Sequence, residues 1–202
     1  MSPALEQRRS DNTQVYGPHC ATLYASTAAQ THMQTLGHYF NPTATLENKL
    51  ALAGASYELA QALPHVVAYL GEVFPLSEPH EAKIQAILLD YLHARGDVTV
   101  YGEPSADRAK RVPTISFNVA GWDPKALVEK AEALQAEEKI SPEYGFRWGH
   151  FYAKRLCDDI LGCGENAVVR VSMVHYNTEA EAKGLCELLD KVLGKGKGAS
   201  AS

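Results

Sequence analysis

The stretch AVVRVSMVHYNTEAEAKGL, residues 167–185, constrains the fold of this chain more than any other part of its sequence. Residues 167–174 are rich in valine, and β-branched side chains favour extended backbone, so we predict a strand there. Thr178 and Glu181 follow with the spacing of a capping box, which begins a helix. Five apolar residues then recur at helical spacing: Ala182, Leu185, Leu188, Leu189 and Val192. A strand followed by such a helix indicates a sheet with helices packed on one face.

Two further segments repeat this pattern closer to the middle of the chain. Residues 79–95 carry an apolar stripe before Gly96, which predicts an amphipathic helix. That stripe consists of Ile84, Ile87, Leu88, Tyr91 and Leu92. Residues 98–101 predict a short strand. In residues 115–121 every second side chain is apolar, so one face of this strand turns inward: Ile115, Phe117 and Val119.

The next helix is predicted from its first two residues. Asp123 is a favourable N-cap, and Pro124 is tolerated at the first helical position, so a helix should run from here to about Glu137. Helices mixed with short strands predict the α/β fold class. We expect a compact α+β domain over residues 79–193.

Residues 15–78 have a less regular pattern. Residues 20–26 predict a strand, and residues 36–56, rich in Asn, Pro, Thr and Gly, predict a long surface loop. Residues 57–74 have helical spacing, although Pro64 should kink or restart that helix. The polar residues 1–14 and the tail 194–202 are expected to be disordered.

Composition excludes several classes of protein. The chain has 202 residues, 46% of them hydrophobic, and a net charge of −5, which gives no basic surface for nucleic acid. Four cysteines without zinc-type spacing indicate reduced, mostly buried thiols. The N-terminus has no apolar core of a signal peptide, and no apolar run approaches the length of a membrane span. We therefore expect a cytoplasmic protein.

Arg170 lies in the middle of the otherwise apolar strand 167–174. A guanidinium is costly to bury without a partner, so this residue requires an anion or an exposed face. It either pairs with an acidic residue at a solvated edge or binds the carboxylate of a ligand. From the strand alone, the first interpretation is favoured.

The segment RWGHFYA, residues 147–153, is the second candidate for chemistry. Its glycine indicates a tight loop that enters a helix, and Arg147 and His150 beside a helix N-terminus would suit an anion. A surface turn with an incidental histidine is the simpler alternative. The eight histidines show no HExxH motif or paired ligand spacing, and the chain has no GxSxG, P-loop or GxGxxG motif.

Taken in order, four segments resemble the C-terminal half of class V aminotransferase-family enzymes. These are fold-type-I pyridoxal-phosphate (PLP) proteins, among them cysteine desulfurases, selenocysteine lyase and isopenicillin N epimerase-like enzymes. VYGPH (15–19) resembles the segment after the family's cofactor lysine, and RVPTISFNVAG (111–121) the strand that opens its small domain. RWGHFYA resembles its R-x-G-H-x-C/Y-A loop, and residues 169–185 its closing strand and helix. The resemblance extends over residues 15–193.

The resemblance implies the partial fold of a PLP-dependent transferase, with residues 15–78 as a remnant of the cofactor-binding large domain. The family's lysine forms an imine with PLP, and the position that matches it here is Gln14. Tyr152 matches the cysteine that carries the persulfide in desulfurases. Cys157 is better explained as structural. On this basis no residue is assigned as catalytic.

The binding residues of the family do have counterparts in this chain. Arg170 matches the arginine that binds the substrate's α-carboxylate, and Arg147 and His150 match residues that line the site. Gly54 lies near the position of a Gly-Thr pair that reaches the cofactor phosphate of a neighbouring subunit, although its hydroxyl neighbour is absent. The expected ligand is an amino-acid-like small molecule.

Three hypotheses of function follow. The first is a truncated, aminotransferase-like pseudoenzyme with weak or no PLP catalysis alone. The second is a non-catalytic assembly module that pairs with a full-length PLP-dependent paralogue, or with a second copy of itself. The third is an enzyme with different chemistry that uses Arg147, His150 and Tyr152, and the sequence favours it least.

Overall fold

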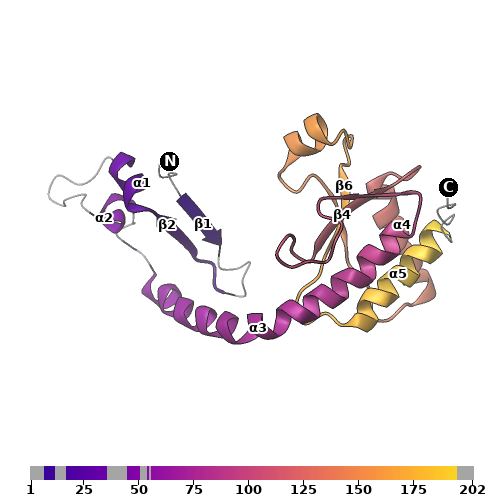
Figure 1. Cartoon of the computed structure of the whole chain (residues 1–202), viewed down its shortest axis with the longest axis horizontal. Helices are drawn as coiled ribbons and strands as arrows, with labels where there is room; N and C mark the ends of the chain where they lie inside the picture. The colour runs from indigo at the N-terminus through magenta and orange to yellow at the C-terminus, as the bar shows by residue number, and fades with distance from the viewer. Residues whose placement is uncertain (1–6, 12–16, 36–44, 51–53, 55, 195–202) are drawn as a thin grey trace. The chain divides into compact units, whose positions relative to one another are not determined.

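The computed structural model describes residues 7–11, 17–35, 45–50, 54 and 56–194 (Figure 1). The chain divides into two compact units, Met1–Val73 and Phe74–Ser202, which we call unit 1 and unit 2. The boundary falls inside the longest helix of the chain.

Unit 1 contains a two-stranded antiparallel sheet, formed by β1 (Gln7–Asp11) and β2 (Ala21–Ala25). Strand β2 confirms the strand expected at 20–26. Strand β1 shows that the expectation of disorder over 1–14 was wrong for its five residues. The polar side chains of β1 gave no signal for a strand, because it pairs with β2 through backbone N–H and C=O groups, which need no apolar side chains.

Two short helices follow in unit 1. Helix α1 (Thr27–His32) begins at Ser26, whose side chain accepts a hydrogen bond from the backbone of Ala29. Helix α2 (Leu46–Leu50) lies inside the segment 36–56, where we expected a loop. Thr45 caps it by accepting a hydrogen bond from the Asn48 amide at 3.1 Å, so a short helix is possible even in this loop-like composition.

Helix α3 (Tyr57–His93) is continuous over 37 residues, whereas we expected separate helices over 57–74 and 79–95 and a kink or restart at Pro64. Proline lacks the N–H of one hydrogen bond, but its own φ is helical, so the helix can continue through it. Every buried residue of α3 lies in its C-terminal part, from Ser77 onward. Ile84, Leu88 and Leu92 of the predicted stripe are fully buried, which confirms the apolar face of that part.

Unit 2 has a four-stranded antiparallel sheet in the order β3-β4-β6-β5. Its strands are β3 (Val98–Tyr101), β4 (Thr114–Val119), β5 (Arg147–Gly149) and β6 (Val168–Ser172). Helices α4 (Pro124–Glu138) and α5 (Glu179–Leu193) begin at the predicted caps Asp123 and Thr178. Both reciprocal hydrogen bonds of the capping box are present.

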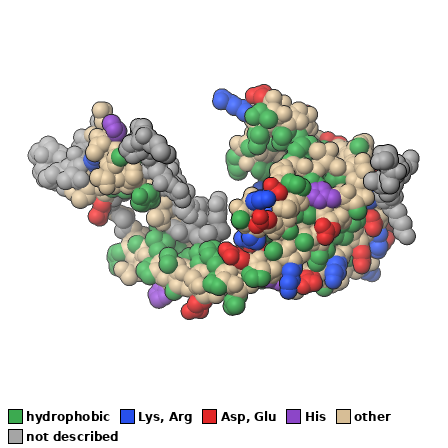
Figure 2. Space-filling view, viewed as in Figure 1, with side chains coloured by type: hydrophobic (Ala, Val, Ile, Leu, Met, Phe, Trp, Pro, Cys, Tyr) green, Lys and Arg blue, Asp and Glu red, His purple; other side chains and the backbone are tan. Residues whose placement is uncertain are grey.

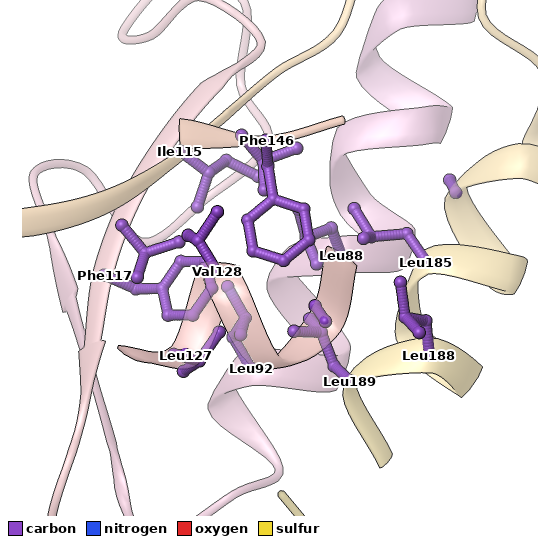
Figure 3. Close-up of a cluster of buried hydrophobic side chains, with 14 of the residues drawn as sticks. Leu88, Leu92, Ile115, Phe117, Leu127, Val128, Phe146, Leu185, Leu188 and Leu189 are labelled. Carbon is purple, nitrogen blue, oxygen red and sulfur yellow. The ribbon is translucent and has the colours of Figure 1, made fainter. Parts of the chain in front are cut away.

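The core of unit 2 lies between one face of this sheet and the three helices α3, α4 and α5 (Figure 3). The strands contribute Ile115 and Phe117 from β4 and Val169 and Val171 from β6, all buried. The helices contribute the following leucines and valine: Leu88, Leu92, Leu127, Val128, Leu185, Leu188 and Leu189. The opposite face of the sheet is left without a helix from this core.

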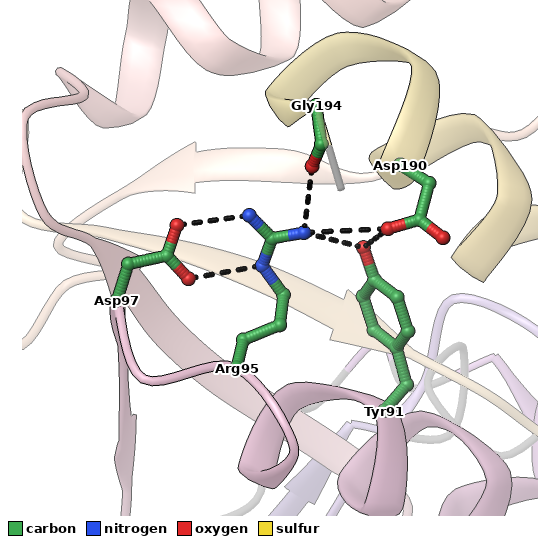
Figure 4. A network of polar contacts seen from close by, with 5 residues as sticks. All are labelled: Tyr91, Arg95, Asp97, Asp190 and Gly194. Carbon is green, nitrogen blue, oxygen red and sulfur yellow. Dashed lines mark hydrogen bonds and ion pairs between the residues drawn. The ribbon is translucent and has the colours of Figure 1, made fainter. Parts of the chain in front are cut away.

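A polar network joins the ends of α3 and α5 to the start of β3 (Figure 4). The Arg95 guanidinium is buried and donates to both carboxylate oxygens of Asp97, at 3.0 and 2.8 Å. It also donates to the Gly194 carbonyl at 3.0 Å and to Asp190 at 3.3 Å. The Tyr91 hydroxyl donates to the same Asp190 oxygen at 2.9 Å. Burial, followed by this hydrogen bond, raises the pKa of Tyr91 above its ordinary value.

Candidate functional site

Arg170 lies on the face of the sheet that points away from the core. In the antiparallel register it is opposite Ser116 of β4 on one side and Arg147 of β5 on the other. Directly opposite residues share a face, and the neighbours Val169 and Val171 are buried on the other face. The strand predicted from the valine-rich residues 167–174 is confirmed as β6.

The Arg170 guanidinium is held by an aromatic ring. Its Cζ atom lies 3.9 Å from the centroid of the Phe151 ring, a cation–π contact (an attraction between a cation and an aromatic face). Its Nε is buried and has no hydrogen-bond partner among the described residues. A buried donor without an acceptor costs about 1–3 kcal/mol, so this arginine is suited to receive an anion.

Arg147 is more exposed than Arg170. Its side chain is 74% exposed and forms an ion pair with Glu132 of α4 at 3.7 Å. The structure places Arg147 in strand β5, whereas we expected a loop there. His150 follows the strand and is exposed, and its carbonyl accepts a hydrogen bond from Ala153 at 2.8 Å.

The turn after β5 has an unusual backbone. Gly149 has a φ of 131°. Phe151 and Tyr152, which follow His150, also have positive φ values, 47° and 65°. Side-chain-bearing residues rarely adopt positive φ, and each such residue costs about 1–3 kcal/mol unless the surroundings hold it. In Phe151 this conformation accompanies the contact with Arg170. Tyr152, which matches the family's persulfide cysteine, is fully exposed.

The helix expected over residues 151–161 is shorter: residues 154 and 155 are α-helical and lead into the π-helical turn Leu156–Ile160. An anion site at its N-terminus is therefore not supported. Cys157 lies in this turn and is buried, as expected of a structural cysteine. Burial is the main reason that the pKa of its thiol is raised.

A polar cluster near Arg170, which consists of Tyr101, Asn118 and Cys163, was not predicted from the sequence. The Tyr101 hydroxyl of β3 receives hydrogen bonds from the Asn118 side-chain amide at 3.3 Å and from the Cys163 thiol at 3.4 Å. Burial, and next the hydrogen bond with Cys163, raises the pKa of Tyr101 to about 12. Tyr101 is opposite Ser116, so one row of the sheet reads Tyr101, Ser116, Arg170 and Arg147. The polar alternation at Ser116 and Asn118 was the available signal for this face.

The predicted sites of unit 1 are only partly described. Gln14 lies outside the described residues, while Gly54 is described and exposed. Lys49 is the one lysine in the sequence of unit 1, and its ammonium donates to the Gln30 carbonyl at 2.5 Å. The side chains of unit 1 therefore do not fit PLP held as an imine at the family's lysine position, because the amide of Gln14 is not nucleophilic and the ammonium of the only lysine in this unit donates to a carbonyl.

In the described parts of the chain, no three His, Cys, Asp or Glu side chains come together as a metal site. Over the same residues, no helix combines the length and apolarity needed to cross a bilayer.

The fold of this chain is similar to that of solved cysteine desulfurases. One is the cysteine desulfurase CsdA from Escherichia coli, with a TM-score of 0.68 and 17% identity. A cysteine desulfurase from Thermococcus onnurineus NA1 has a TM-score of 0.64 and 21% identity. These matches cover 92% and 90% of this chain and 45% of each solved chain. The chain has a class V aminotransferase-like α/β fold over that part.

Comparison of sequences identifies the relatives. The chain is 47% identical over 183 residues to the aminotransferase-like protein FGM3 of Gibberella zeae, and 32% identical over 184 residues to the cysteine desulfurase-like protein ustD of Aspergillus flavus. Each match covers 89% of this chain but 44% and 40% of those proteins. No family model matches. The chain is a homologue of aminotransferase-like and cysteine desulfurase-like proteins and spans less than half the length of these two relatives.

Proposed function

We propose that unit 2 binds the carboxylate of an amino-acid-like ligand at Arg170. The observation that carries this proposal is the buried Arg170 Nε without a hydrogen-bond partner among the described residues. The Phe151 ring covers one face of the guanidinium. An arginine edge binds a carboxylate through two parallel hydrogen bonds, which gives orientation as well as affinity.

We further propose that this chain alone has weak PLP catalysis or none. The absence of a suitable lysine in unit 1 supports this view, because Lys49 is its only lysine and its ammonium donates to the Gln30 carbonyl. Residues of unit 2 would then bind and orient the ligand, while an imine-forming amine would have to come from another chain.

We also place this protein in the cytoplasm. Its four cysteines all lie in the described part of the chain, and none of them forms a disulfide.

Carboxylate binding can be tested by nuclear magnetic resonance. The ¹⁵N-labelled chain is titrated with L-alanine, and the backbone amide signals of Val169 and Val171 are followed, because these residues flank Arg170 and are present in every variant. We expect Arg170→Gln to weaken binding by at least about tenfold, because a hydrogen bond to a charged group contributes about 1.5–3 kcal/mol. Arg155→Gln is the matched control, since Arg155 is exposed and the charge change is the same. Equal affinity in the two variants would refute the site.

The cofactor proposal needs a separate experiment. The chain is mixed with one equivalent of PLP and treated with borohydride, which converts an imine into a stable amine. Peptide mass spectrometry then shows which lysines carry the label. We expect sparse label spread over the exposed lysines. Stoichiometric label on Lys49 or any other single lysine would contradict the proposal.

The second candidate function is an assembly module that pairs with a longer homologue. Large apolar side chains are exposed along the N-terminal half of α3, and Figure 2 shows hydrophobic side chains over this helix. The exposed residues there are Tyr57, Leu59, Val67, Tyr69, Phe74 and Leu76. Contiguous exposed apolar surface favours a protein partner. Co-purification with an intact homologue, lost in Val67→Asp, would support this role, and a monomer that binds no homologue would exclude it.

A further inference from the structure

Arg147 and Arg170 occupy directly opposite positions on the exposed face of the unit 2 sheet. In this β5–β6 register their Cβ atoms leave the same face about 4.5–5.5 Å apart. Like charges in this arrangement destabilise a sheet. Among the described residues no carboxylate forms an ion pair with Arg170, which leaves its charge uncompensated.

The partner of Arg147 is only loosely held. Its 3.7 Å ion pair with Glu132 joins two side chains that are 74% and 53% exposed. Exposed pairs of this kind contribute about 0–1 kcal/mol, so a ligand carboxylate can replace Glu132 at little cost. Arg147 is thus available to a ligand that already occupies the neighbouring Arg170.

From this juxtaposition we propose that Arg147 and Arg170 together select a short dicarboxylate. One carboxylate binds Arg170, and the second binds Arg147 in place of Glu132. This inference rests on the carboxylate site proposed at Arg170 and adds a specificity residue to it. A ligand with one carboxylate uses only half of the positive charge on this face, whereas a dicarboxylate relieves the repulsion between the two arginines.

The test compares three anions on the full chain at constant ionic strength, because screening would otherwise mask the effect. Propionate supplies one carboxylate, succinate supplies two, and inorganic phosphate supplies a compact dianion. Affinities come from the Nε–Hε signals of Arg147 and Arg170. Two equivalent carboxylates already favour succinate by a statistical factor of about two, so we expect a preference of about three- to tenfold once an exposed ion pair is added.

Two variants change the preference in opposite directions. Arg147→Gln should reduce it to the statistical factor, whereas Glu132→Gln should increase it because Arg147 is then released. Arg155→Gln controls for the change in net charge that Arg147→Gln makes. Since Arg147 and Glu132 are both largely exposed, both variants should still fold, which a cooperative thermal unfolding transition will show.

The outcomes separate this inference from the function on which it rests. If succinate and propionate both bind and Arg147→Gln leaves their ratio unchanged, the dicarboxylate inference is overturned and the Arg170 site stands. Tighter binding of phosphate than of succinate also overturns it. If neither acid binds the unaltered chain, the Arg170 site fails, and the dicarboxylate inference fails with it.

Discussion

Replacement of Arg95 by methionine should be among the more destabilising polar changes in unit 2. Arg95 donates two hydrogen bonds to Asp97, one to the Gly194 carbonyl and one to Asp190 (Figure 4). Hydrogen bonds to charged groups contribute about 1.5–3 kcal/mol each when their partners stay buried. The Asp97 and Asp190 side chains are 38% and 44% exposed, so water can replace the lost donor. Discounting each bond to about 0.5–1 kcal/mol gives a total loss of about 2–4 kcal/mol.

Urea unfolding followed by tryptophan fluorescence measures this loss. Both tryptophans of the chain, Trp122 and Trp148, lie in unit 2, so the signal reports on the unit that Arg95 holds together. Methionine keeps most of the apolar stem, so cavity formation contributes little. Arg95→Lys should lose an intermediate amount, because an ammonium cannot donate the paired bonds to Asp97. A loss below about 1 kcal/mol for methionine, or full stability with lysine, would refute this reasoning.

Three further changes test other parts of the structure. A Cβ at Gly184 would lie 1.9 Å from the Tyr144 hydroxyl, so Gly184→Ala should destabilise unit 2 by about 1–3 kcal/mol, and Tyr144→Phe in that background should recover part of it. Additive effects in this double-mutant cycle would argue against the clash. Tyr152→Gly should increase the free energy of unfolding by up to about 1 kcal/mol, because Tyr152 is fully exposed at a φ of 65° that glycine adopts freely. A less stable variant would show that the tyrosine makes a useful contact. The hydrogen bond from Arg95 is the main cause that lowers the pKa of Asp97 below its ordinary value of 3.8. The contribution of this pair to the free energy of unfolding is therefore complete above about pH 4, and it is lost as the pH falls through the lower pKa of Asp97 in the folded state. Asp97→Asn should accordingly reduce the loss of stability at acid pH. An unchanged acid limb would contradict that assignment.

Local signals in the sequence were enough to locate most elements of unit 2. The caps at Asp123 and Thr178 begin α4 and α5, and alternation over residues 115–119 defines β4 and its buried face. Each of these signals acts within a few residues, through a side chain that bonds to a nearby backbone amide or through a period of two. The resemblance that these segments carry also led to the correct class of relatives and pointed to Arg170.

Other features depend on partners that are distant in the sequence. The polar segment of β1 becomes a strand only because β2 pairs with it, and α3 continues through three prolines that locally predict interruption. The Phe151 ring reaches Arg170 through a backbone conformation that its own residue type disfavours.

The sequence alone therefore determined where β3, β4, β6, α4 and α5 form in unit 2 and which face of β4 and of α5 is buried. Only the tertiary structure decided that Arg147 and Arg170 lie opposite each other, that Phe151 covers one of them, and that Arg95 joins three elements. Strand register and side-chain contacts depend on interactions between residues that are far apart in the chain, so they cannot be predicted from a local sequence pattern.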